Sequence, residues 1–386
     1  MKLITLLLLA FILVSRSQAA IWVVNQNGTG NFLTIQSAIN SPTVQSGDTI
    51  FLAPSNHFEQ GIANSTKSLT YLGSGYDASI IHGGGFTLTN GVHRFSGLHI
   101  DGSINATLCD SLKLESVELA GAVLSDNCYH TDIIGCRIGG TVTHPSNAIT
   151  GSTFKLQRCR TSGVSVSNAA ATITQNVVDG TNNLVSLSAN GSSAISNNVL
   201  RHASGNLVSI IELSNTSSYA IVVTNNVLYY TQSAQRYAIS AGNSTAYIFN
   251  NILREGGFLP IRDVGPSTAV GYNSVFNMLG GMPGPGNIGG DPRFVEFNTS
   301  DPPDSLDFHL LSISPCINTG NPDAQYNDLD GSRNDMGVYG GVGPIGSIPI
   351  VVEPPNYPAV TNLSLFPVIV PGNGTIEIRA TGRIGR

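Results

Sequence analysis

The chain has 386 residues, of which 11% are charged, against about 25% in a typical soluble domain. It contains 43 glycines and carries a formal net charge of −6. Its lysines and arginines form no cluster that would give a nucleic-acid-binding protein its basic face, so we expect no nucleic-acid partner. The many Ile, Val, Asn, Ser, Thr and Gly residues instead favour short strands joined by tight turns.

Residues 1–19 have the pattern of a signal peptide. Lys2 gives a positive start, Leu3–Val14 form an apolar stretch, and the small residues Ser17 and Ala19 place the expected cleavage after Ala19. An apolar run of about 12 residues is too short to cross the ~30 Å hydrocarbon core of a bilayer. We therefore predict a secreted or cell-surface protein with no membrane span.

An N-terminal cap is expected at the start of the mature chain. Ile21 to Val24 have the composition of a strand, and Ile35 and Ile39 then follow a helical spacing with Thr34 at the N-cap position. An open solenoid exposes the edge of its first coil, and a short helix here would cover it. Further strands are predicted at Thr49–Leu52, Leu69–Leu72 and Ser79–His82.

A six-residue segment recurs nine times between residues 95 and 275, at intervals of 17 to 28 residues. Every copy begins with an apolar residue, and all but one end with an apolar residue. The copies are FSGLHI, LESVEL, IIGCRI, LQRCRT, ITQNVV, ISNNVL, VTNNVL, IFNNIL and VGYNSV. Such self-similarity indicates a solenoid, and coils of roughly 22 residues leave no room for a helix in each repeat.

The position of a residue within the segment predicts where its side chain points. Positions one and six point into the coil, position five points outward, and position four lies at a sharp turn between two strands. Asparagine at position four would hydrogen-bond from coil to coil at the ~4.8 Å strand spacing, and it tolerates left-handed backbone. Five successive copies carry it, as Asn176, Asn198, Asn226, Asn251 and Asn273. We predict an all-β fold, a single-stranded parallel β-helix over residues 20–290.

The repeat resembles the right-handed parallel β-helix superfamily, which includes pectate and pectin lyases, polygalacturonases and pectinesterases. The resemblance covers residues 21–290, and the opening string from Val23 to Pro54 resembles that of pectinesterases. It implies right-handed coils and a polysaccharide ligand. The sequence lacks the DFIFG-like and LGRPW-like strings of pectinesterases, the NTD, DD and RIK-like strings of polygalacturonases, and recognisable charged triads of Ca²⁺-dependent pectate lyases. The resemblance thus implies the fold and leaves the activity open.

Outward position five carries ionisable residues on four successive coils. They are His99, Glu118, Arg137 and Arg160. As catalytic or binding residues they would suit an anionic sugar chain, because Arg offers a fork for carboxylates and Arg or His can act as a base in β-elimination. The alternative, which we favour, is a surface ladder of ion pairs between neighbouring strands. Later coils are apolar at this position, and Tyr229 and Tyr230 are candidates for stacking on sugar rings.

Four of the five cysteines are expected to stack in pairs. Cys109 and Cys128 each lie eight residues before position four, and Cys136 and Cys159 both occupy position four. Stacked neighbours have Cα atoms about 4.8 Å apart, within the disulfide range of 4.4–6.8 Å. Two disulfides are therefore predicted in an exported protein, with rows of buried thiols as the alternative. Cys316 is left over as a free thiol.

After the last repeat the spacing changes. The strings GGDPRFVEF (Gly289–Phe297), DFHLLSISPCINTGNP (Asp307–Pro322) and NDLDGSRNDMGVYGG (Asn327–Gly341) resemble the C-terminal module of many bacterial secreted β-helix proteins, and we place this module at residues 291–341. We interpret this module as the last coil and cap. Residues 342–386 are predicted to form a Pro/Gly-rich linker followed by a short β tail.

Three carboxylates in this C-terminal module are candidate metal ligands. Asp328, Asp330 and Asp335 are clustered as a hard cation prefers, so Ca²⁺ is the one cofactor that the sequence indicates. An EF-hand pattern would need an acid where Tyr326 stands. We therefore favour the alternative, turn chemistry with Arg333 paired to an acid.

Two functions remain open at this point. The first is a secreted β-helix protein that acts on or binds extracellular polysaccharide, either as a lyase or hydrolase or by binding alone. The second is a structural or adhesive surface module without catalysis, which the missing catalytic strings favour almost equally. In both cases we expect a monomer.

Overall fold

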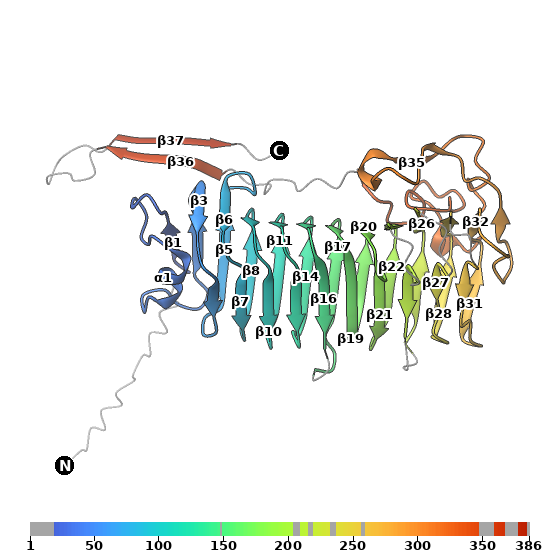
Figure 1. The fold of residues 1–386 in the computed structure, drawn as a ribbon, viewed down its shortest axis with the longest axis horizontal. Coiled ribbons are helices and arrows are strands. Elements are labelled where there is room, and N and C mark those ends of the chain that lie inside the picture. Colours follow the sequence, from blue (N-terminus) through green and yellow to red (C-terminus); the bar gives the residue numbers. More distant parts are fainter. Residues whose placement is uncertain are drawn as a thin grey trace, which may run out of the picture.

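The computed structural model describes residues 19–146, 149–203, 209–214, 219–231, 237–255, 259–346, 359–366 and 377–383. The predicted signal peptide lies outside the described residues except for Ala19, and so does the predicted linker from residue 347 onward. Within these ranges no helix is both long enough and apolar enough to cross a membrane. The described chain is nearly all β, and most of its strands belong to parallel stacks (Figure 1).

Three parallel stacks of strands form the sides of the solenoid, and each strand pairs with strands one coil away. The first sheet contains β1 (Ile21–Val24), β2 (Thr49–Leu52), β5 (Leu69–Gly73), β8 (Val92–Ser96), β11 (Ser111–Glu115), β14 (His130–Ile134), β17 (Thr153–Gln157), β19 (Gly163–Thr174), β22 (Ser193–Ser196), β25 (Ile221–Thr224), β28 (Ala246–Phe249) and β31 (Thr268–Gly271). The second sheet contains β3 (Ser55–Phe58), β6 (Ser79–His82), β9 (His99–Ile100), β12 (Glu118–Leu119), β15 (Arg137–Ile138), β18 (Arg160–Thr161), β20 (Val177–Gly180), β23 (Val199–His202), β26 (Val227–Tyr230), β29 (Ile252–Arg254), β32 (Ser274–Phe276) and β33 (Ile288–Gly289). The third contains β4 (Ile62–Asn64), β7 (Phe86–Thr89), β10 (Ile104–Thr107), β13 (Val123–Asp126), β16 (Thr141–Pro145), the start of β19, β21 (Val185–Ala189), β24 (Ile211–Leu213), β27 (Ile239–Ser240) and β30 (Ile261–Arg262).

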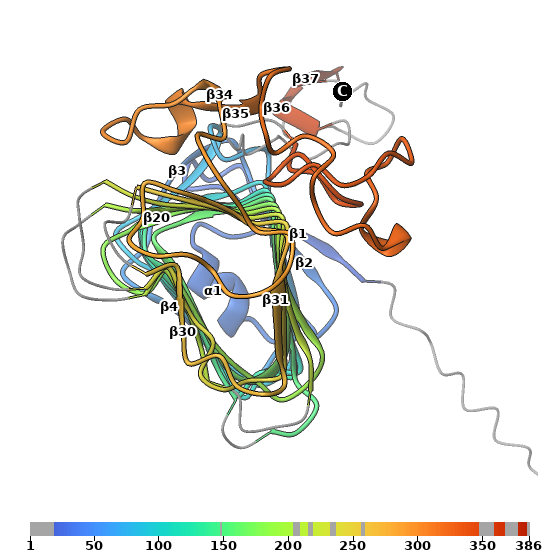
Figure 2. The same cartoon turned by 90° about the vertical axis from the view of Figure 1, so that its right-hand side faces the viewer.

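Each coil passes through the first, second and third sheets in turn before the next coil begins, as the end-on view in Figure 2 shows. This is the predicted right-handed parallel β-helix. Inward residues of neighbouring coils lie in register and are fully buried, as in the row Leu114, Ile133, Leu156 and Ile173. Burial of each such side chain is worth about 1.5–3 kcal/mol, so the aliphatic rows supply the main driving force for folding.

The asparagine ladder at position four is confirmed. Asn226 shows the pattern: its Oδ1 accepts hydrogen bonds from the backbone N and the Nδ2 of Asn198, at 3.0 and 2.9 Å, and its Nδ2 donates to Oδ1 of Asn251 at 2.9 Å. The ladder runs from Cys159 N, which donates to Asn176, to Asn287, which accepts from Asn273. All five predicted members are fully buried. Each side-chain amide therefore accepts the hydrogen bond from the neighbouring coil's backbone N–H that water would otherwise accept.

Left-handed backbone, however, occurs one position earlier than expected. Position three has positive φ in successive coils, including Asn197 (54°), Asn225 (57°) and Asn250 (61°), whereas the ladder residues that follow do not. The paired Asn-Asn sequences therefore divide two roles, because the first residue makes the turn and the second makes the ladder.

The N-terminal end is closed by α1 (Ile35–Asn40), as predicted. Thr34 is its N-cap: Oγ1 accepts from Ser37 N at 3.1 Å, and the Ser37 hydroxyl accepts in return from Thr34 N at 3.3 Å. The apolar face of the helix is buried against the first coils through Ile35, Ala38 and Ile39. Figure 2 shows α1 within the outline of the coils when they are viewed end-on.

The cysteine pairs stack as expected, but the two predicted disulfides are not formed in the structure, where all five cysteines are free and buried. Tyr129 N donates to Cys109 O, which places Cys128 one coil above Cys109. Cys136 N lies 3.4 Å from Cys159 Sγ. Burial raises the pKa of the Cys136 thiol, so it stays protonated. The structure thus contains two rows of stacked thiols, and oxidation of each row to a disulfide stays a prediction for the exported protein.

The C-terminal module covers the side of the solenoid and not its end, which differs from our expectation of a last coil. Its antiparallel pair β34 (Phe294–Glu296) and β35 (Asp307–Leu310) and the short helix η1 (Pro303–Ser305) lie outside the second sheet, with β35 labelled in Figure 1. The short helix η2 (Ala324–Tyr326) lies instead against β28 of the first sheet, where the ring centroids of Tyr326 and Phe249 are 5.7 Å apart. A second hydrophobic core results, which joins the module to outward residues of the second sheet. Those outward residues are Val177, Val199, Val227, Tyr229 and Ile252. Beyond the module, β36 (Ala359–Phe366) and β37 (Glu377–Arg383) pair as an antiparallel hairpin.

Candidate functional site

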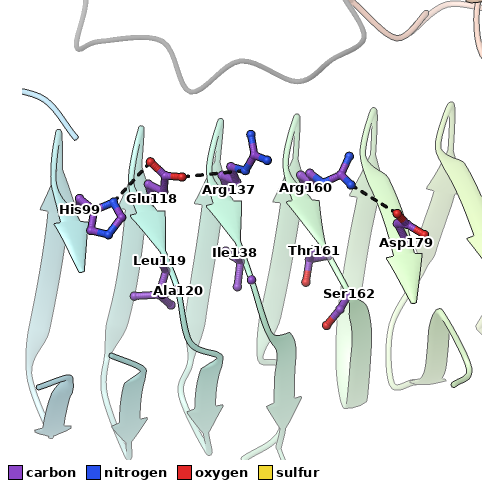
Figure 3. Close-up of a pocket in the computed structure, with 11 residues that line it drawn as sticks. His99, Glu118, Leu119, Ala120, Arg137, Ile138, Arg160, Thr161, Ser162 and Asp179 are labelled. Carbon is purple, nitrogen blue, oxygen red and sulfur yellow. Dashed lines mark hydrogen bonds and ion pairs between the residues drawn. The ribbon is translucent and has the colours of Figure 1, made fainter. Parts of the chain in front are cut away.

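The four ionisable residues predicted as a row do lie together on the outer face of the second sheet (Figure 3). His99 is in register with Glu118, Glu118 with Arg137, and Arg137 with Arg160. Their order follows from coil length, because each coil places position five of its segment at the same point of the sheet. We call these four residues the charged row.

A hollow lies beside the charged row. Residues two positions further along each coil form a second outward row, which reads Phe58, His82, Asp101, Ala120, Gly139, Ser162, Asp179, Arg201, Tyr229 and Arg254. Its three middle members are small, while both ends carry large side chains. The hollow has a volume of about 290 Å³ and is lined by the charged row, Leu119, Ile138, Thr161 and Asp179 in addition to the small residues. From the coil of His99 to the coil of Asp179 it spans four coil spacings, or about 19 Å.

The charged row continues into a hydrogen-bonded network of histidines and carboxylates. Both ring nitrogens of His99 face carboxylates: Nε2 lies 2.9 Å from Asp101 Oδ1, and Nδ1 lies 3.4 Å from Glu118 Oε2. Asp101 Oδ2 also accepts from His82 Nδ1 at 2.5 Å. The hydrogen bond from His82, helped by the one from His99, holds the pKa of Asp101 below its usual range. Asp101 is therefore ionised at neutral pH.

The two arginines of the charged row differ in what they contact. The Arg160 side chain is 18% exposed and forms ion pairs with Asp179 and with Asp304 of η1. The Arg137 side chain is 52% exposed, and its ion pair with Glu118 is long, at 3.9 Å between Nε and Oε1. Arg137 is therefore the cation that the hollow offers to a ligand.

The C-terminal module closes one end of the hollow. Asp304 contacts Arg160, and Arg201 donates to Ser300 O at 3.3 Å and to Asp179 Oδ1 at 2.9 Å. Beyond this junction the second sheet is covered, so a ligand in the hollow has no open surface in that direction.

The tyrosines predicted as sugar-stacking residues are not available for that role. Tyr229 and Tyr230 are 0% and 1% exposed. Tyr229 packs against Phe297 and Phe308 of the module, with ring centroids 5.1 and 5.9 Å away. The prediction failed for Tyr229 because it treated the whole outer face of the second sheet as open to solvent. It failed for Tyr230 because that side chain belongs to the main core inside the coils.

The three candidate Ca²⁺ ligands are used as turn residues. Asp328 accepts backbone N–H groups of Asp335 at 3.0 Å and of Gly341 at 2.5 Å. Asp335 Oδ1 accepts from Asn318 N at 2.6 Å, and Asp330 caps Ser332. Burial raises the pKa of Asp328 and of Asp335. Within the described part of the chain no group of three or more His, Cys, Asp or Glu residues is placed to hold a metal ion.

Arg333 does not pair with an acid as we expected. Its Nε donates to Gly320 O at 2.7 Å, and its Nη2 donates to Thr319 O at 3.1 Å. The guanidinium therefore holds the loop through backbone carbonyls. This supports turn chemistry in the module, but the partner of Arg333 is a pair of carbonyl groups and not the expected acid.

Sequence reasoning missed the hollow and the extension of the network through His82 and Asp101. The signal was present, because Ala120, Gly139 and Ser162 stand at the same step of three successive coils. Reading the second outward row in the same way as the first would have found the hollow. Asp304 was not predictable in this way, because no repeat connects η1 to the second sheet.

The fold and the site define a parallel β-helix protein with a charged hollow on one outer face. No protein-family profile matches the sequence. No curated protein matches it either. Among solved structures, the chain is similar to "pectate lyase Pel9A", with a TM-score of 0.51 and 15% sequence identity over 83% of this chain and 96% of that one. It also aligns with "PL6 family alginate lyase AlyGC" at a TM-score of 0.39 and 13% identity, over 87% of this chain and 58% of that one. At 15% identity the likeness to the first of these structures shows the fold alone.

Proposed function

We propose that this chain is an extracellular protein that binds an acidic polysaccharide in the hollow beside the charged row. The observation that carries the proposal is the exposed guanidinium of Arg137 beside a hollow lined by Ala120 and Gly139. A guanidinium presents two parallel donors that match a uronate carboxylate. The proposal is supported by the likeness in fold to a solved structure named as a pectate lyase.

Cleavage of the same polysaccharide by β-elimination is the second candidate. It is favoured by the exposed Arg137 guanidinium and the Glu118 carboxylate, which lie side by side in the hollow. In this reaction a base removes the proton on the carbon next to the uronate carboxyl group, a carbon–carbon double bond forms, and the bond to the leaving oxygen breaks as that oxygen takes up a proton from water. His99 is less suited as that base, because both of its ring nitrogens face carboxylates.

Binding is tested by calorimetry with polygalacturonate, alginate and hyaluronan, with dextran as the neutral control. We expect Arg137→Ala to weaken binding about 10- to 100-fold, the equivalent of a lost charged hydrogen bond. Arg94→Ala is the matched control, because Arg94 is exposed on the first sheet. Ultraviolet absorbance of unsaturated products shows whether the bound polymer is also cleaved. If the chain binds none of the polymers, the structural or adhesive function replaces this proposal.

A further inference from the structure

The hollow is open in only one direction along the solenoid. On the side of Arg160 the C-terminal module covers the second sheet. On the other side the outer face continues over the coils of Asp101, His82 and Phe58, and none of the module's described residues is part of a hydrophobic core with residues of these coils. A polysaccharide held at Arg137 can therefore extend only toward the N-terminal end.

An exposed aromatic residue stands at the end of this open path. Phe58 is the last residue of β3, the edge strand of the second sheet, and it lies in register with His82. Its ring centroid is 5.1 Å from that of His82, with 24° between the planes. This separation is close to the ~4.8 Å coil spacing, so the two rings lie one above the other along the axis.

Packing inside the protein does not account for the position of Phe58. The residue is 65% exposed, although a fully buried phenylalanine would gain about 1.5–3 kcal/mol. His82 is held in place from both sides, because its Nδ1 donates to Asp101 and its Nε2 lies 3.0 Å from Asn56 Oδ1. The imidazole thus supports one face of the Phe58 ring and leaves the residue largely open.

We propose that Phe58, supported by His82, is a sugar-stacking platform that ends a one-way binding path from the hollow. This inference rests on the proposed function. A pyranose ring carries C–H groups on its face, so that face packs on an aromatic ring while its hydroxyl groups remain in water. Phe58 and the coil of Arg137 are four coil spacings apart, or about 19 Å. A short oligosaccharide fills the hollow alone, and a longer one also reaches the platform.

The test measures affinity against oligosaccharide length. Oligogalacturonides or oligomannuronates, according to which parent polymer binds, are titrated from disaccharide to decasaccharide into the protein and its variants. We expect the affinity of the unsubstituted protein to rise about three- to tenfold once the oligosaccharide spans the path, which is the size of an aromatic stacking interaction. Phe58→Ala should remove this rise and leave the affinity for the shortest oligosaccharides unchanged, while Phe58→Trp should keep the rise.

Tyr129→Ala is the matched control, because Tyr129 is 47% exposed and lies next to the first sheet. A rise with length that survives in Phe58→Ala overturns the inference and leaves the proposed function intact. So does an equal loss of affinity at every length, because Phe58 would then act on the hollow as a whole. If the unsubstituted protein binds no oligosaccharide of any length, both the proposed function and the inference are overturned.

Discussion

Replacing one asparagine of the ladder should destabilise the whole solenoid. The Asn226 side chain takes part in five hydrogen bonds: it accepts two from Asn198 and donates to Ile195 O, Thr224 O and Asn251 Oδ1. Asn226→Ala leaves the buried backbone N–H of Asn198 without its acceptor. An orphaned buried group costs about 1–3 kcal/mol and a lost bond about 1 kcal/mol, so we expect about 3–6 kcal/mol less stability.

The assay is urea unfolding followed by circular dichroism, with the free energy of unfolding taken by linear extrapolation. Asn105→Ala is the control, because Asn105 lies exposed on β10 and should change the free energy by less than about 0.5 kcal/mol. The double variant Asn198→Ala/Asn226→Ala should lose less than the sum of the single variants, because the two share bonds. A loss below about 1 kcal/mol for Asn226→Ala would show that the ladder is not a stabilising feature.

Three further predictions concern the two ends of the molecule and its cysteines. Asp48 accepts hydrogen bonds from Trp22 Nε1 and from two backbone N–H groups, and these outweigh burial and lower its pKa. The stability that Asp48 contributes is present above the ordinary aspartate pKa and is lost as pH falls below that value. The fluorescence of Trp22, the single tryptophan, should therefore change over this acidic pH range. The change should be absent in the Asp48→Asn variant. Phe308→Ala should loosen the C-terminal module by about 3–5 kcal/mol, seen as faster proteolysis after the last repeat, with the half-exposed Leu311→Ala as control. Protein recovered from an oxidising compartment should show one titratable thiol after unfolding without reductant, because neighbouring thiols stack, and five thiols would refute both disulfides.

The fold was predictable because the coil repeats closely enough to be read directly. Apolar residues at positions one and six fix which side chains point inward, and asparagine at position four marks the turn on successive coils. The same reading placed His99, Glu118, Arg137 and Arg160 in one row. Local rules were sufficient here, because each strand finds its partner one coil away along the chain.

The C-terminal module shows where such local reading stops. Val177, Val199, Val227 and Ile252 stand at an outward position and are nonetheless apolar, which indicates that something covers them. The sequence does not say what the cover is, because the module is not part of the repeat. The burial of Tyr229 and the pairing of Arg160 with Asp304 depend on that docking, and so they were missed.

The first asparagine of each Asn-Asn pair has a consequence for how this solenoid can vary in length. Asn197 donates to Val338 O and Gly340 O, and Asn225 donates to Asp335 O and Gly337 O. Successive coils are therefore tied to successive points of the segment 335–340, which we call the strap. Insertion or deletion of a single turn beneath the strap would shift every later attachment by one step. Turns before Cys136 carry no such tether in the described chain, so natural length changes should accumulate in that half.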